Sequence, residues 1–191
     1  MLARGRILHS YLDLLEMHAG TATNGAFGLK VLSHHVEQHP GLMRQLDQRE
    51  YRCLFLRRDS LREVVSGMVA STRKRYNSME NPPPAESLRL DPVQFENLLR
   101  GAILKTEEIE NSIANWKHGS MTIFYENFTA NPGQFFKEIC GFLEVPIVDT
   151  PETSYKKMIG DIGKEIENLD ELQEIASRYT DEEGRYVFRR D

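Results

Sequence analysis

The stretch CLFLRRDSLREVVSGMVAS, residues 53–71, runs from an apolar segment through two arginines into a helical pattern. After Ser60, apolar residues recur at the spacing of a helix that buries one face, at Leu61, Val64, Val65, Met68 and Val69. Ser60 and Glu63 also match the S-x-x-E pattern of a capping box, which predicts a helix beginning just after the arginines. Open α/β sheets bind ligands at the carboxyl ends of their strands, so the arginines mark a candidate site.

The rest of the chain repeats this alternation of strand and helix. Short apolar runs predict strands at 26–32, 51–56 and 121–125. Helical periodicity predicts helices at 7–15 and 95–116, one that begins at Pro132 after an Asn131 cap, and a polar surface helix near the C-terminus. Parallel strands need crossover helices, so the order predicts an α/β fold: one domain over 1–191, with a parallel sheet flanked by helices.

Composition narrows the function. A net charge of −5 argues against a protein that binds nucleic acid or an anionic membrane. We find neither an apolar run long enough to cross a bilayer nor a leader peptide, and therefore expect a cytoplasmic protein. Cys53 and Cys140 stand in apolar surroundings and are interpreted as small hydrophobes, and no pattern indicates a metal site.

The stretch NSMENPPPAESLRLDP, residues 77–92, contains four prolines and few apolar residues. This composition predicts an exposed connection. Its position after the helix of residues 61–69 suggests a mobile flap over the acceptor side of a site.

Two interpretations of the arginines are open. In the first, Arg58 at the strand end and Ser66 on the following helix converge on one anion, with Arg62 on the same side of that helix. In the second, Arg57, Arg58 and Arg62 are solvated charges that pair with the nearby carboxylates of Asp59 and Glu63.

Three segments carry a family resemblance. FLRRDSLREVVS resembles the segment of sulfotransferases that use 3′-phosphoadenosine 5′-phosphosulfate (PAPS) in which a strand ends in Arg and a Ser follows eight positions later, as Arg58 and Ser66 do here. MTIFYENFTANPGQFFKEICGFLEVP, 121–146, is similar to the strand of that family that ends in Tyr-Glu-Asp, with Tyr125 at the Tyr position. TSYKKMIGDIGKEIENLDEL looks like a late basic segment of its bacterial members.

The resemblance implies a P-loop NTPase-like sulfotransferase fold and transfer of a sulfuryl group from PAPS to a hydroxyl or amine of a small molecule or carbohydrate. It implies that Arg58 and Ser66 bind the 3′-phosphate of the nucleotide and that Tyr125 lies near the adenine. It also implies that Lys156 or Lys157 approaches the nucleotide phosphates. The product would be adenosine 3′,5′-bisphosphate (PAP), and no metal is implied.

Sulfuryl transfer needs a general base that takes the proton of the acceptor hydroxyl or amine. The candidates are Lys30, His34 and His35, at and just beyond the end of FGLKVL. The alternative is that Lys30 is a surface charge and the two histidines only start a helix.

The family holds the 5′-phosphosulfate in a Gly/Ser/Thr-rich loop between its first strand and first helix, and no strand before residue 20 leads into such a loop. We therefore expect a chain that is N-terminally truncated relative to an active sulfotransferase, with weak or absent turnover. The other hypotheses are a nucleotide-binding relative without chemistry and a helical adaptor whose arginines contact a protein.

Overall fold

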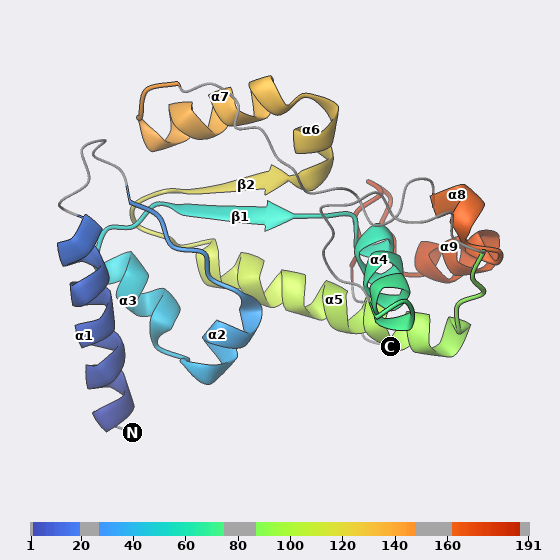
Figure 1. The fold of residues 1–191 in the computed structure, drawn as a ribbon, viewed down its shortest axis with the longest axis horizontal. Coiled ribbons are helices and arrows are strands. Elements are labelled where there is room, and N and C mark those ends of the chain that lie inside the picture. Colours follow the sequence, from blue (N-terminus) through green and yellow to red (C-terminus); the bar gives the residue numbers. More distant parts are fainter. Residues whose placement is uncertain (1, 20–26, 75–86, 148–161, 188–191) are drawn as a thin grey trace.

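The computed structural model describes residues 2–19, 27–74, 87–147 and 162–187. These ranges are mostly helical and contain one small sheet of two parallel strands. In chain order the elements are α1 (Leu2–Ala19), α2 (Ser33–Gln38), α3 (Leu42–Gln48), β1 (Cys53–Arg57), α4 (Ser60–Thr72), α5 (Pro92–Ile113), β2 (Ser120–Phe124), α6 (Tyr125–Ala130), α7 (Pro132–Leu143), α8 (Ile162–Glu165) and α9 (Leu169–Ser177). In the view of Figure 1, α6 and α7 lie on one side of the strands, and α2, α3 and α5 lie on the other.

The two strands pair in parallel from Cys53 opposite Ser120 to Arg57 opposite Phe124. Both were predicted, within two residues of their observed ends. None of their ten residues is buried, and Leu56 and Phe124 expose 56% and 41% of their surface. Parallel sheets are usually covered on both faces, so this sheet is not the centre of the core.

The strand expected over 26–32 is wrong for the described residues 27–32, which form no strand. The alternation that suggested it is present, since Leu29 and Val31 pack inward while Lys30 and Leu32 are exposed. The structure describes no neighbouring strand that pairs with this segment. An alternating pattern reports which side chains are buried, but it does not supply the hydrogen-bonding partner that defines a strand.

The main core is built from helices. Its buried side chains come from α4, α5 and α9 and from residues just outside them, and the most deeply buried are Val65, Val69, Phe95, Leu99, Ile103 and Leu172. The predicted apolar stripe of α4 is confirmed as buried. The helix predicted over 95–116 is α5, which buries Phe95, Leu99, Ile103 and Ile113, whereas Leu98 is 46% exposed and Trp116 lies beyond the end of the helix.

Two helix starts show how capping fixes the ends. Asn131 caps α7 as predicted, because its side chain accepts a hydrogen bond from the backbone N–H of Gln134 at 3.1 Å. For α4 the predicted cap is wrong by one residue: Asp59 is the N-cap and accepts from the N–H of Arg62 at 2.8 Å, while Ser60 is the first helical residue. Asp and Ser are both favoured at the N-cap, and here Asp59, one residue before Ser60, takes that position.

The proline-rich stretch is only partly described, because residues 75–86 lie outside the described ranges. Its described end alternates between exposed and covered residues: Ser87, Arg89 and Asp91 are exposed, whereas Leu90 is 4% exposed and Leu88 forms an isolated bridge with Ile166. The buried side chain of Asn168 bonds to both the N–H and the carbonyl of Leu90 at 3.0 Å. A flap over the whole of 77–92 is therefore wrong at this end, where apolar burial anchors the chain.

A second, smaller apolar cluster lies near the N-terminus. It consists of the buried Leu12, Leu42 and Leu46, with Leu29, Val31, Tyr51 and Trp116 packed around them. The indole Nε1–H of Trp116 donates to the carbonyl of Tyr51 at 2.6 Å, which ties the end of α5 to the segment leading into β1. We call these seven residues the N-terminal cluster.

Candidate functional site

Two of the predicted nucleotide-binding residues meet where the strands end. Arg57 and Phe124 are the last paired residues of β1 and β2, so Arg58 and Tyr125 follow side by side at the carboxyl edge of the sheet. The guanidinium carbon of Arg58 lies 4.9 Å from the centroid of the Tyr125 ring, a cation–π distance. Arg58 therefore presents its guanidinium from a fixed position over an aromatic face.

One hydrogen-bond donor of the Arg58 side chain has no acceptor among the described residues. The side chain is half-buried, and the donor is its buried Nε. A buried donor without a partner costs about 1–3 kcal/mol, more for a charged group. An anion bound at this edge would supply the missing acceptor.

The interpretation in which the arginines pair with nearby carboxylates does not describe this edge. Arg57 pairs instead with Glu110 on α5, at 2.8 Å. Neither Arg58 nor Arg62 forms an ion pair within the part of the chain that the structure describes. Burial raises the pKa of Glu63, and the charge of Arg58 acts in the opposite direction, so the two groups interact without direct contact.

Aromatic neighbours hold Tyr125 in place. Its ring lies 6.1 Å from that of Phe128, which packs at 5.4 Å from Phe135 and 6.0 Å from Phe136. Phe135 is buried, so this cluster is anchored through α7. A base stacked near Tyr125 would find an aromatic surface that moves little.

The start of α4 is already occupied by carboxylates. The Asp59 side chain caps the helix, and its own N–H donates to Oε1 of Glu126 at 3.2 Å. Negative groups satisfy the positive end of a helix, so the first turn of α4 has less to offer a phosphate than the sequence suggested. An anion bound at this edge would therefore depend on the Arg58 side chain.

The other predicted nucleotide ligands are not brought together in the same way. Ser66 is half-buried and Arg62 is exposed on α4, and among the described residues no hydrogen bond, ion pair or ring contact joins either side chain to Arg58. Lys156 and Lys157 lie outside the described residues.

The predicted catalytic residues lie on a separate element. Lys30 is exposed in the extended segment, and His34 and His35 lie in the first turn of α2 with ring centroids 4.1 Å apart. Nδ1 of His35 accepts a hydrogen bond from the Leu32 N–H at 3.1 Å, so this ring helps to cap α2. Among the described residues, no hydrogen bond, ion pair or ring contact links these three side chains to Arg58 or Tyr125.

α2 itself is tied to α5. Glu37 near the end of α2 forms an ion pair with Lys105, which lowers the pKa of Glu37 through a direct hydrogen bond. This ion pair joins the helix that carries the histidines to α5.

The sequence interpretation missed two contributors to the site. Glu126, in the Tyr-Glu-Asn string, accepts from Asp59 and so joins the ends of the two strands. Tyr186 comes from far along the chain: burial raises its pKa to about 12, and the charges of Asp59 and Arg62 act on it in opposite directions. The string at the strand end was a signal for Glu126, but no local pattern indicates Tyr186.

Other kinds of site have less support. In the ranges that the structure covers, no group of three or more His, Cys, Asp or Glu side chains is arranged to hold a metal ion. No helix there combines the length and the apolar character needed to cross a bilayer. Comparison with known proteins adds no relative, because no family model, curated protein or solved structure matches the chain.

Proposed function

We propose that the carboxyl edge of the two strands binds the 3′-phosphate and adenine of PAPS, and that the protein acts in sulfuryl transfer to a hydroxyl or amine of a small molecule or carbohydrate. The observation that carries this proposal is Arg58, stacked at 4.9 Å over Tyr125 with a buried Nε that lacks an acceptor. A phosphate accepts hydrogen bonds from guanidinium in a planar, charge-assisted geometry. The resemblance of residues 53–71 and 121–146 to sulfotransferase segments points to the same two residues.

In this proposal each residue has a separate task. Arg58 binds the 3′-phosphate and Tyr125 offers its ring to the adenine, while the hydroxyl of Ser66 adds a donor from α4. In the reaction the acceptor oxygen or nitrogen bonds to sulfur, the bond from sulfur to the bridging phosphate oxygen breaks, and PAP leaves. For the acceptor proton we propose His34, which is exposed and makes no hydrogen bond within the described ranges, in preference to His35, whose Nδ1 is already used.

The binding half of the proposal is tested by calorimetric titration with PAP and with adenosine 5′-monophosphate, which lacks the 3′-phosphate. Arg58→Ala should weaken PAP binding by about 1.5 to 3 kcal/mol, roughly 10- to 150-fold in Kd, and leave the monophosphate unaffected. Arg57→Ala is the matched control, since it removes the same charge one residue earlier from a guanidinium already bound to Glu110. Equal losses in both variants would show a nonspecific charge effect, and no binding of PAP would leave the adaptor hypothesis.

Chemistry is tested separately with PAPS labelled in its sulfuryl group and a panel of hydroxyl and amine acceptors. Transfer that is lost in both Arg58→Ala and His34→Asn would support the full proposal. Binding of PAP without transfer would reduce it to a nucleotide-binding relative. This second experiment is the more demanding one, because no contact among the described residues connects the histidines of α2 to Arg58 or Tyr125.

A further inference from the structure

The described side chains of α1 make few buried apolar contacts with the rest of the molecule and several polar ones. Of its described side chains, those of residues 9–18, Leu12 is the one that is buried, at 2% exposed. Three large apolar side chains remain exposed, since Tyr11, Leu14 and Met17 are 56%, 49% and 64% exposed, and Leu15 is half-buried. A single buried leucine contributes about 1.5–3 kcal/mol, so the polar contacts matter for whether α1 stays docked.

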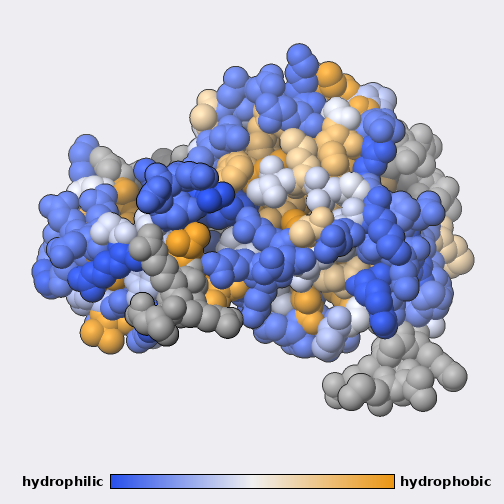
Figure 2. All heavy atoms as spheres, turned by 180° about the vertical axis from the view of Figure 1, so that it is seen from behind, coloured by the Kyte–Doolittle hydropathy of each residue, from blue (hydrophilic) through white to orange (hydrophobic). Residues whose placement is uncertain are grey.

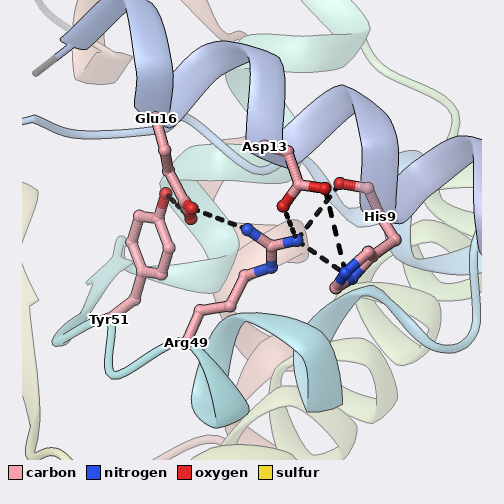
Figure 3. A network of polar contacts seen from close by, with 5 residues as sticks. All are labelled: His9, Asp13, Glu16, Arg49 and Tyr51. Carbon is pink, nitrogen blue, oxygen red and sulfur yellow. Dashed lines mark hydrogen bonds and ion pairs between the residues drawn. The ribbon is translucent and has the colours of Figure 1, made fainter.

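These contacts converge on Arg49, at the end of α3 (Figure 3). Its Nη1 donates to Glu16 at 2.6 Å, and its Nη2 donates to Asp13 at 2.5 Å and to the backbone carbonyl of His9 at 3.1 Å. Glu16 also accepts from the hydroxyl of Tyr51 at 2.9 Å. The guanidinium Nε is buried and has no described acceptor, so the two Nη atoms make all of these bonds.

His9 completes the network in one protonation state. Its Nδ1 lies 2.9 Å from Nη2 of Arg49. A guanidinium only donates, so Nδ1 must accept and the ring proton must be on Nε2, which faces Asp13 at 3.8 Å. We propose that protonation of His9 releases α1, because it places a second donor and a second positive charge against the guanidinium that holds the helix.

The consequence for Arg49 is specific. A protonated Nδ1 cannot stay 2.9 Å from Nη2, so either the imidazole turns away or the guanidinium moves. The charged ring also competes with Arg49 for the Asp13 carboxylate, four residues along the helix. Both effects weaken the contacts that join α1 to α3.

The ionisable groups of the network around His9, which come from α1, α3 and the segment after α3, keep their charge state over the range in which histidines are protonated. Arg49 lowers the pKa of Asp13 through a direct hydrogen bond, so that carboxylate stays charged. Burial opposes the charge of Arg49, but hydrogen bonds and charges from Asp13 and Glu16 raise its pKa overall. Burial and Glu16 raise the pKa of Tyr51 to about 12, so its phenol stays neutral.

The chain contains its own reporter of α1 docking. It has a single tryptophan, Trp116, which packs in the N-terminal cluster against which Leu12 of α1 is buried. Departure of α1 would open this cluster to water. The emission of Trp116 should then move to longer wavelength.

The experiment follows Trp116 emission and hydrogen exchange of the α1 amides in the full chain from about pH 8 to about pH 5.5, the range in which histidines take up a proton. We expect a red shift on acidification and about tenfold faster exchange relative to the intrinsic rate, the effect of losing one hydrogen bond to a charged group. Far-UV circular dichroism checks that the remaining helices are unchanged.

Two variants of His9 separate the mechanism from general acid sensitivity. His9→Asn places an oxygen near the position of Nδ1 that cannot be protonated, so α1 should stay docked across the range. His9→Gln places its amide near Nε2, so α1 should be loosened at every pH. His39→Asn, at an exposed position beyond α2, should keep the wild-type transition. A transition that survives in His9→Asn, or its absence in the wild type, would overturn the proposal.

Discussion

The main core and the N-terminal cluster are held together by different forces. The main core excludes water from side chains on three helices, and Val65, Phe95 and Leu172 are each 0% exposed. Among the described residues, the N-terminal cluster fully buries Leu12, Leu42 and Leu46, and the ion pairs of Arg49 add polar contacts that join α1 to α3. Burial in the main core depends little on pH or salt, whereas the Arg49 network depends on both.

This difference places the candidate site on the stable part of the molecule. α4, which follows Arg58, is one of the three helices of the main core. The sheet contributes less to the hydrophobic core than the sequence suggested, since none of its residues is buried. Figure 2 shows that apolar surface remains in the middle of the back face, framed by hydrophilic side chains.

The largest effect should come from truncation in the main core. We expect Phe95→Ala to lower the free energy of unfolding by about 3–5 kcal/mol, because it leaves a cavity among helices that are fixed by other contacts. Leu12→Ala should cost about 2 kcal/mol, the lower end for a buried leucine, since few neighbours lose contacts. Urea unfolding measures both, and equal losses would contradict the distinction between the two clusters.

The next effect concerns a polar group inside the main core. Asn168→Leu should cost about 2–3 kcal/mol, because it leaves the N–H and the carbonyl of Leu90 buried without their partner. Asn131→Ala is the matched control: it removes an asparagine that caps α7 at the surface, at a cost of about 1 kcal/mol. A loss for Asn168→Leu no greater than for Asn131→Ala would mean that the Leu90 groups find water instead.

Local patterns predicted what depends on local physics. The buried stripe of α4, the cap of α7 and the positions of β1 and β2 follow from side-chain periodicity and capping, which the sequence displays directly. The placement of Arg58 beside Tyr125 was predictable once the two strands were taken as parallel neighbours.

Contacts between distant residues were not predictable in this way. Arg49 with Asp13, Arg57 with Glu110 and Asn168 with Leu90 pair polar groups through the tertiary structure. The failure at 26–32 has the same origin, because a strand requires a partner whose position the segment does not encode. Arg57 shows the consequence for site prediction: two adjacent arginines look equivalent in sequence, yet one is bound by α5 and the other is not.

A smaller effect should distinguish the Arg49 network by its pH dependence. The pKa of Asp13 is lowered in the folded protein, so its contribution to stability is present above the unfolded value of about 4 and is lost as the pH falls through the folded pKa. The melting temperature of the wild type should therefore fall more steeply below about pH 4 than that of Asp13→Asn. In an Arg49→Met background, Asp13→Asn should make no further difference, since the two residues act through one contact. Additive effects would show that Asp13 acts through some other group.

The smallest effect should come from the sheet itself. Leu56 belongs to β1, in the sheet that was expected to organise the fold, yet it is 56% exposed, whereas Val65 on α4 is 0% exposed. Leu56→Thr keeps a residue that favours strands, so the free energy of unfolding should change by no more than about 0.5 kcal/mol. Val65→Thr makes a smaller change in volume but buries a hydroxyl, and it should cost about 1–3 kcal/mol. If urea unfolding gave the reverse order, the sheet would be covered by a contact that the described residues do not make, and the helices would no longer account for the stability of the molecule.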